Sequence, residues 1–95
     1  MKHKLTYGVV RDHPRRVIHV VRVMDALLET DELDDIAATM RQHVLTRHGE
    51  QEAAVVVVQG DSKETLRLFG EFYAVTRVRS AMFNAAISWR AFDLA

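Results

Sequence analysis

The chain has 95 residues, no net formal charge at pH 7 and 48% hydrophobic residues, which suffices for one domain with its own core. The balanced charge argues against nucleic-acid binding through bulk positive charge, and the absence of cysteine is typical of a reducing cytoplasm. The longest apolar run, AAVVVV, is well short of the ~20 residues of a membrane helix. We therefore expect a single cytoplasmic domain over residues 1–95, with residues 84–95 as a C-terminal extension and with no membrane or nucleic-acid partner.

A strand and a helix are the first elements expected in chain order. Alternating side chains predict a strand over residues 5–10, and Pro14 follows at a position that suits the first turn of a helix. Apolar side chains then recur at offsets of three and four, which predicts a helix through Val17, Val20, Val21, Met24, Leu27 and Leu28. Residues 29–35 are acidic and polar, and we interpret them as a loop.

Residues 36–48 fit two structures. As a helix, the segment places Ile36, Met40 and Val44 on one face, and Gly49 is a suitable C-terminal stop. As a strand, it could pair with residues 52–59 through a hairpin. The local pattern slightly favours the helix, but a four-stranded topology requires a strand. We therefore predict a strand over residues 36–46.

The segment from residue 52 to residue 83 has the pattern of a strand, a helix and a second strand. EAAVVVVQ is β-branched and ends at Gly60, and Asp61 with Glu64 fits a capping box. Leu66, Phe69 and Tyr73 then follow at helical spacing, and RVRSAMF would be the last strand. The whole order predicts an α+β, ferredoxin-like βαββαβ fold with two helices on one face of a four-stranded antiparallel sheet.

The other face of such a sheet would need a cover. If the face that carries Ala38, Met40 and Val44, or its opposite, is open, another subunit must bury it, so we expect a dimer or a tetramer. The apolar tail residues fit two roles, packing back on the domain or contacting another subunit; they are Ile87, Trp89, Phe92 and Leu94.

Five histidines are the residues most able to carry chemistry: His3, His13, His19, His43 and His48. None of them has zinc-finger spacing, so spacing alone is a weak metal signal. In the strand interpretation, Arg41 and His43 project from one face, and His43 and His48 bracket the hairpin. His13 would end the first strand, and a dimer that apposes two sheets could bring it near His43.

Three strings resemble the C-terminal regulatory domain of nickel-responsive ribbon-helix-helix repressors (the NikR type). GVVRDHPRR is similar to that family's first strand, IAATMRQHV to its second, and EAAVVVVQGDSKETLRLFGEFYAVTRVRSAMF to its last strand–helix–strand unit. The resemblance covers about residues 6–83. It implies an ACT-like domain that assembles as a tetramer and binds nickel between subunits.

Carried over residue by residue, the resemblance implies two of four nickel ligands. His13 matches the histidine that a neighbouring subunit supplies, and His43 matches the second histidine of the family's His-x-His pair. Arg41 stands in place of the first histidine, and Glu52 in place of the cysteine. An arginine cannot ligate a metal ion. Because the first strand begins near Leu5, we also expect a module without the family's DNA-binding segment.

Three interpretations of these residues stay open. His13 could cap the first helix while His43 is an ordinary strand residue. His13, His43, Glu52 and His48 could bind another divalent metal such as zinc. Arg41, with His13 or His43, could bind an anion or a small carboxylate. The expected function is a ligand- or metal-responsive regulatory module acting as a homo-oligomer; the alternative is a small enzyme that uses His13 or His43 as a general acid and base.

Overall fold

The computed structural model describes residues 3–13, 16–49, 53–60 and 65–94, without the side chains of Asp12 and His13. In these ranges the elements are β1 (Leu5–His13), β2 (Arg16–Val23), α1 (Thr30–His48), β3 (Ala54–Gln59), β4 (Arg67–Phe69), α2 (Phe72–Phe83) and β5 (Arg90–Phe92). The chain thus combines helices and a sheet, which confirms the predicted α+β class.

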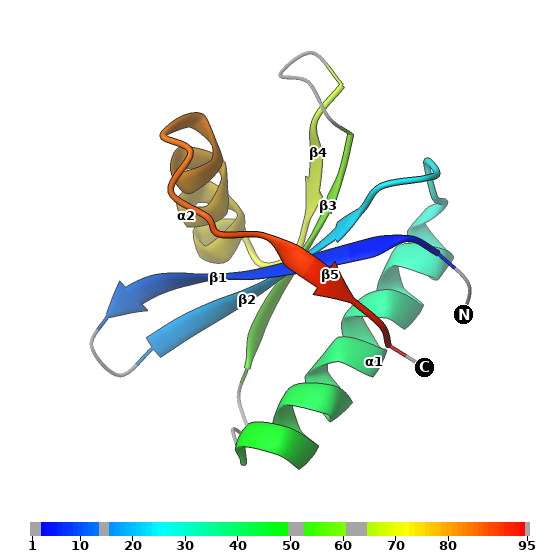
Figure 1. Cartoon of the computed structure of the whole chain (residues 1–95), viewed down its shortest axis with the longest axis horizontal. Coiled ribbons are helices and arrows are strands. Elements are labelled where there is room, and N and C mark those ends of the chain that lie inside the picture. Colours follow the sequence, from blue (N-terminus) through cyan, green and yellow to red (C-terminus); the bar gives the residue numbers. More distant parts are fainter. Residues whose placement is uncertain (1–2, 14–15, 50–52, 61–64, 95) are drawn as a thin grey trace.

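The strands form one mixed sheet in the order β4-β3-β2-β1-β5 (Figure 1). β2 and β3 are parallel, because α1 connects them, while the other neighbouring pairs are antiparallel. The sheet therefore has five strands and one parallel pair, in place of the four antiparallel strands that the sequence predicted.

The two helices cover opposite faces of this sheet. α1 packs on one face through Leu33, Ile36 and Met40, together with Val21 and Val57 of the strands. α2 packs on the other face through buried Ala74 and Val78. The prediction that both helices share one face is therefore wrong, and each face has its own helical cover. An open sheet face was the reason to expect a dimer or a tetramer, and that reason no longer applies. Self-association therefore stays a prediction.

β2 occupies the segment in which we predicted the first helix. Ile18 to Val21 are buried consecutively, because β2 lies between β1 and β3 and is covered on both faces. A strand buried on both faces has a nearly continuous apolar sequence. Such a run also contains apolar pairs at offsets of three and four, the spacing of a helical stripe, and this explains the incorrect helix prediction.

α1 begins at Thr30, so it takes up all but the first residue of the predicted loop at residues 29–35 and the whole predicted strand at residues 36–46. Both predictions are wrong. Its buried side chains are Leu33, Ile36, Ala37, Met40 and Val44, the stripe that the local pattern indicated. Gly49 ends the helix with a φ of 68°, and its N–H donates to the Leu45 carbonyl. Acidic residues in the first turn and basic residues in the last also suit the helix dipole.

The next helix begins later than predicted. Leu66 and Leu68 pack on the α2 face of the sheet and Phe69 on the α1 face, as expected for a strand, and α2 begins at Phe72. RVRSAMF is the C-terminal half of α2, so its prediction as a strand is wrong. The predicted capping box of Asp61 and Glu64 lies outside the described residues.

The C-terminal segment packs back on the domain. β5 pairs with Leu5 to Tyr7 of β1, and Phe92 joins the α1 side of the core while Ile87 joins the α2 side. This confirms the first of the two roles predicted for the tail. Neither α1 nor α2 is long and apolar enough to cross a membrane.

Candidate functional site

A buried tyrosine–histidine pair lies on the α1 face of the sheet. β1 and β2 pair with Val9 opposite His19, and Tyr7 lies two residues from Val9, so Tyr7 and His19 share a face. Tyr7 Oη and His19 Nδ1 form a hydrogen bond of 2.7 Å, and both side chains are buried. This bond fixes the orientation of the His19 ring.

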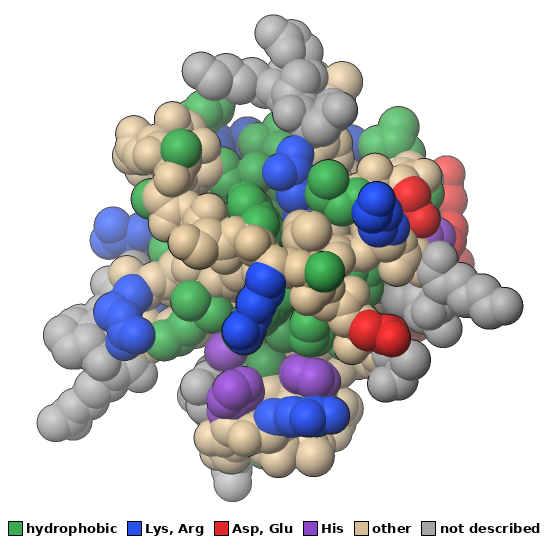
Figure 2. Space-filling view, in the orientation of Figure 1, with side chains coloured by type: hydrophobic (Ala, Val, Ile, Leu, Met, Phe, Trp, Pro, Cys, Tyr) green, Lys and Arg blue, Asp and Glu red, His purple; other side chains and the backbone are tan. Residues whose placement is uncertain are grey.

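The last turns of α1 bring two more histidines to the same place. The rings of His19 and His48 lie 6.0 Å apart between centroids, and His43 is close enough to both for Coulombic effects. We call His19, His43 and His48 the histidine cluster. Figure 2 shows histidine side chains gathered between the sheet and the C-terminal end of α1, with Lys or Arg side chains beside them.

β5 supplies the aromatic side of the cluster. The ring of Phe92 meets that of His43 edge-on at 5.1 Å and lies 5.1 Å from that of Tyr7. The Arg90 guanidinium lies over Tyr7, 5.3 Å from the ring centroid. Side chains from β1, β2, α1 and β5 therefore converge on one surface, where a cation–π contact adds a positive charge.

The surroundings of His43 disfavour its protonation. Desolvation by burial holds the pKa of this imidazole below its usual 6.5, and Coulombic effects of Arg47, His48 and His19 act in the same direction. Each charge that lowers the pKa is thus positive or becomes positive on protonation. A bound anion would reverse this effect and favour imidazolium.

The described side chains around the cluster are basic or aromatic. Within the described ranges, no three His, Cys, Asp or Glu side chains meet in an arrangement that could hold a metal ion. His43 and His48 are five residues apart on α1, and a spacing of three or four would place two ligands side by side. An arginine adds a positive charge and no ligand atom.

The structure brings together some of the residues predicted from the sequence. His43 and His48 are both in the histidine cluster. Arg41 is exposed, and its place two residues before His43 on a helix turns it roughly 200° away, so these two do not share a face as they would on a strand. The side chain of His13 and all of Glu52 lie outside the described residues.

Tyr7 and Arg47 were not identified as site residues from the sequence, and His19 was named only as one of the five histidines, without a place in a site. Arg47 follows His43 by four residues, so it lies on the same side of α1. The β-branched residues on both sides of Pro14 could have indicated two strands joined by a hairpin. Such a hairpin pairs Val9 with His19. The helical interpretation of residues 14–28 concealed this pairing.

The histidine cluster extends from buried His19 through half-buried His43 to exposed His48. Two cavities of about 240 and 270 Å³ lie near the start of α1, and no residue of the histidine cluster lines either of them. The cluster members that solvent reaches are His48 and part of His43. Comparison with known proteins identifies no relative: no protein-family model, no curated protein and no solved structure matches this chain.

Proposed function

We propose that this protein is a binding module for a small anionic ligand, such as a carboxylate, phosphate or sulfate group, at the histidine cluster. The observation that carries the proposal is the convergence of three imidazoles with Arg47 and Arg90 from separate elements. Planar guanidinium groups recognise carboxylate and phosphate oxygens well, and imidazolium adds charge-assisted hydrogen bonds. The expected role as a ligand-responsive module is consistent with such a site.

Proton uptake should accompany anion binding. His43 has a lowered pKa, so it is neutral at pH 7 and becomes a cation when an anion compensates its neighbours. Anion affinity should therefore rise as the pH falls. A metal would show the opposite trend, because only neutral imidazole is a ligand.

Isothermal titration with sulfate at pH 6 and at pH 8 tests the proposal. Sulfate keeps its charge over this range, so the trend reports the protein alone. We expect tighter binding at pH 6, and about tenfold weaker binding in Arg47→Ala. Arg41→Ala is the matched variant on the same helix and should bind as the parent does.

Two results would contradict this site. Loss of binding in Arg41→Ala but not in Arg47→Ala would favour the residue that the sequence pointed to. Equal sulfate affinity at both pH values would show that the histidines do not contribute charge to anion binding. A panel of small carboxylates and phosphates then identifies the ligand class in the same assay.

The nickel-regulator resemblance remains a separate hypothesis. It depends on His13 and Glu52, which lie outside the described residues, together with His43. Elemental analysis of the purified protein and titration with nickel and zinc at two pH values test it. Metal binding that weakens below about pH 6.5 and is lost in His43→Gln would support it.

A second candidate function is acid–base catalysis by His43. Its lowered pKa keeps the imidazole neutral near pH 7, where it can accept a proton. Turnover of a substrate panel that is abolished in His43→Gln, while folding is kept, would support catalysis over binding alone.

A further inference from the structure

The solvent side of α2 combines an exposed aromatic ring with positive charge. Phe72 is 88% exposed, the highest value among the large hydrophobic residues. Thr76 and Arg79 follow at offsets of four and seven, which places them on the same exposed stripe. α2 contains arginines and no acidic residue; Glu71 precedes it. We call Phe72, Thr76 and Arg79 the α2 stripe.

A pocket lies on another part of the molecule, where β2 ends. Its volume is about 240 Å³, and it is lined by Val23, Met24, Ala26, Leu27 and Gly60. Leu27 is 69% exposed and Met24 is 45% exposed, so apolar surface surrounds the opening. We call this hollow the β2-end pocket. Burial of an aromatic ring against it would remove apolar surface of both partners from water.

Acidic residues come shortly after most of the pocket-lining residues in the sequence. The exposed acidic residues at the start of α1 are Glu29, Asp31, Glu32, Asp34 and Asp35. Acidic side chains gather at the right of Figure 2, where α1 begins. The pocket and its acidic neighbours therefore complement the α2 stripe in both polarity and charge.

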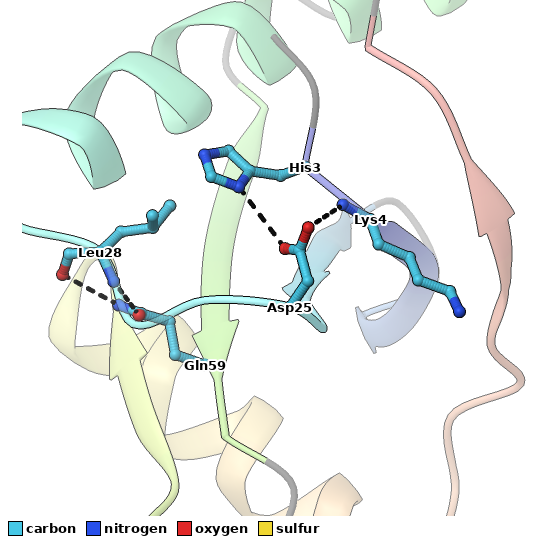
Figure 3. A network of polar contacts seen from close by, with 5 residues as sticks. All are labelled: His3, Lys4, Asp25, Leu28 and Gln59. Atoms are coloured by element: carbon cyan, nitrogen blue, oxygen red, sulfur yellow. Dashed lines mark hydrogen bonds and ion pairs between the residues drawn. The ribbon is translucent and has the colours of Figure 1, made fainter.

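Hydrogen bonds hold the segment that carries Met24 and Leu27 (Figure 3). The Leu28 N–H donates to Gln59 Oε1 at 2.5 Å, and Gln59 Nε2 donates to the Leu28 carbonyl at 3.5 Å. At the other end, the Lys4 N–H donates to Asp25 Oδ2 at 3.0 Å. A segment fixed in this way loses little conformational entropy on binding.

The two surfaces cannot meet within one molecule. α2 packs on one face of the sheet, whereas Val23 and the start of α1 belong to the other face (Figure 1). A contact between them must join two molecules, and it is head-to-tail because surfaces on opposite faces of the sheet cannot both lie in one two-fold interface. Such a contact either closes into a ring or continues as a filament.

We propose that the α2 stripe of one copy docks on the β2-end pocket of a second copy, with Phe72 in the pocket and Arg79 beside the acidic start of α1. This assembly is independent of the anion site. It gives the self-association expected from the sequence a basis other than an open sheet face.

Sedimentation velocity over a concentration series tests the contact. The parent protein should associate in a concentration-dependent way, and added salt should weaken the association because charges are paired. Phe72→Ser and Leu27→Arg should each raise the dissociation constant at least about tenfold. Leu45→Ser is the matched control: it also removes an exposed apolar side chain, but from the last turn of α1, and should leave association unchanged.

Mixing the two defective variants identifies the geometry. Phe72→Ser keeps its pocket and Leu27→Arg keeps its α2 stripe, so one intact contact can form between them. At a concentration near the dissociation constant of the parent, we expect each variant alone to be mostly monomeric and the mixture to give a 1:1 dimer that grows no further. A mixture that stays monomeric, a parent protein that is monomeric at high micromolar concentration, or equal weakening by Leu45→Ser would overturn the proposal.

Discussion

Gln59 is a buried amide whose hydrogen bonds define the segment before α1. It is 1% exposed, and it pairs with both the N–H and the carbonyl of Leu28. Gln59→Leu would leave these backbone groups without their partner, which costs about 1–3 kcal/mol of unfolding free energy. Urea denaturation measures the change. Gln42→Leu makes the same replacement at an exposed position of α1 and should shift stability by less than about 0.5 kcal/mol. A similar loss in both variants would refute the role of the bond.

Tyr7 determines how the His19 ring is presented to the cluster. Tyr7→Phe keeps the ring that packs on Phe92 but removes the hydroxyl at His19 Nδ1. We expect a loss of about 1 kcal/mol in stability and a changed tautomer population of His19 in imidazole nitrogen NMR. Unchanged His19 resonances would show that this hydrogen bond does not orient the ring.

At the level of elements, the local pattern was the better guide over residues 36–48 but misled over the β2 segment. The strand at the start, the valine-rich β3 and the stripe of Ile36, Met40 and Val44 were all visible in the sequence. The strand over residues 36–46 was wrong because the four-stranded topology was given more weight than that stripe. β2 was missed for a physical reason, since burial on both faces removes the alternation that identifies a strand.

The candidate site could be predicted only in part, because it depends on these elements. His43 and His48 were identified as chemically able residues, but Arg41 was paired with His43 through strand geometry. Because residues 36–48 form a helix, Arg47 and not Arg41 lies on the same side as His43. The pairing of β1 with β2 adds Tyr7 and His19 to the site. Side chains distant in sequence meet through strand register, which the sequence did not reveal here.

Gly8 controls how the segment before β5 reaches β1. A Cβ at this position would overlap Ile87 Cγ2, a branched atom with little freedom to move, and would lie 3.2 Å from the Ser88 carbonyl oxygen. Gly8→Ala should therefore destabilise the fold by about 1–3 kcal/mol. Combined with Ile87→Ala, which removes the overlapping group, it should cost less than the sum of the single changes. Additive losses in thermal denaturation would contradict this contact.

The stability of the whole molecule should fall in mild acid because of His43. Its folded pKa lies below the unfolded value of about 6.5, through burial first and then through Arg47, His48 and His19. As the pH falls through 6.5, the unfolded chain takes up a proton before the folded one, so the free energy of unfolding decreases. Tyr7, Phe92 and Arg90 of the neighbouring strands supply no carboxylate to this packing.

Urea denaturation at pH 7.5 and pH 5.5, in chloride buffer without multivalent anions, measures this loss. His43→Gln cannot titrate, so its stability should fall less over the same interval. Asp25 does not interfere: its pKa is lowered from 3.8, mainly by the Lys4 N–H, so its contribution disappears only in stronger acid. Added sulfate should restore stability at pH 5.5 in the parent more than in His43→Gln, because an anion at the cluster stabilises the imidazolium. An identical pH dependence in the two proteins would mean that other groups cause the acid sensitivity.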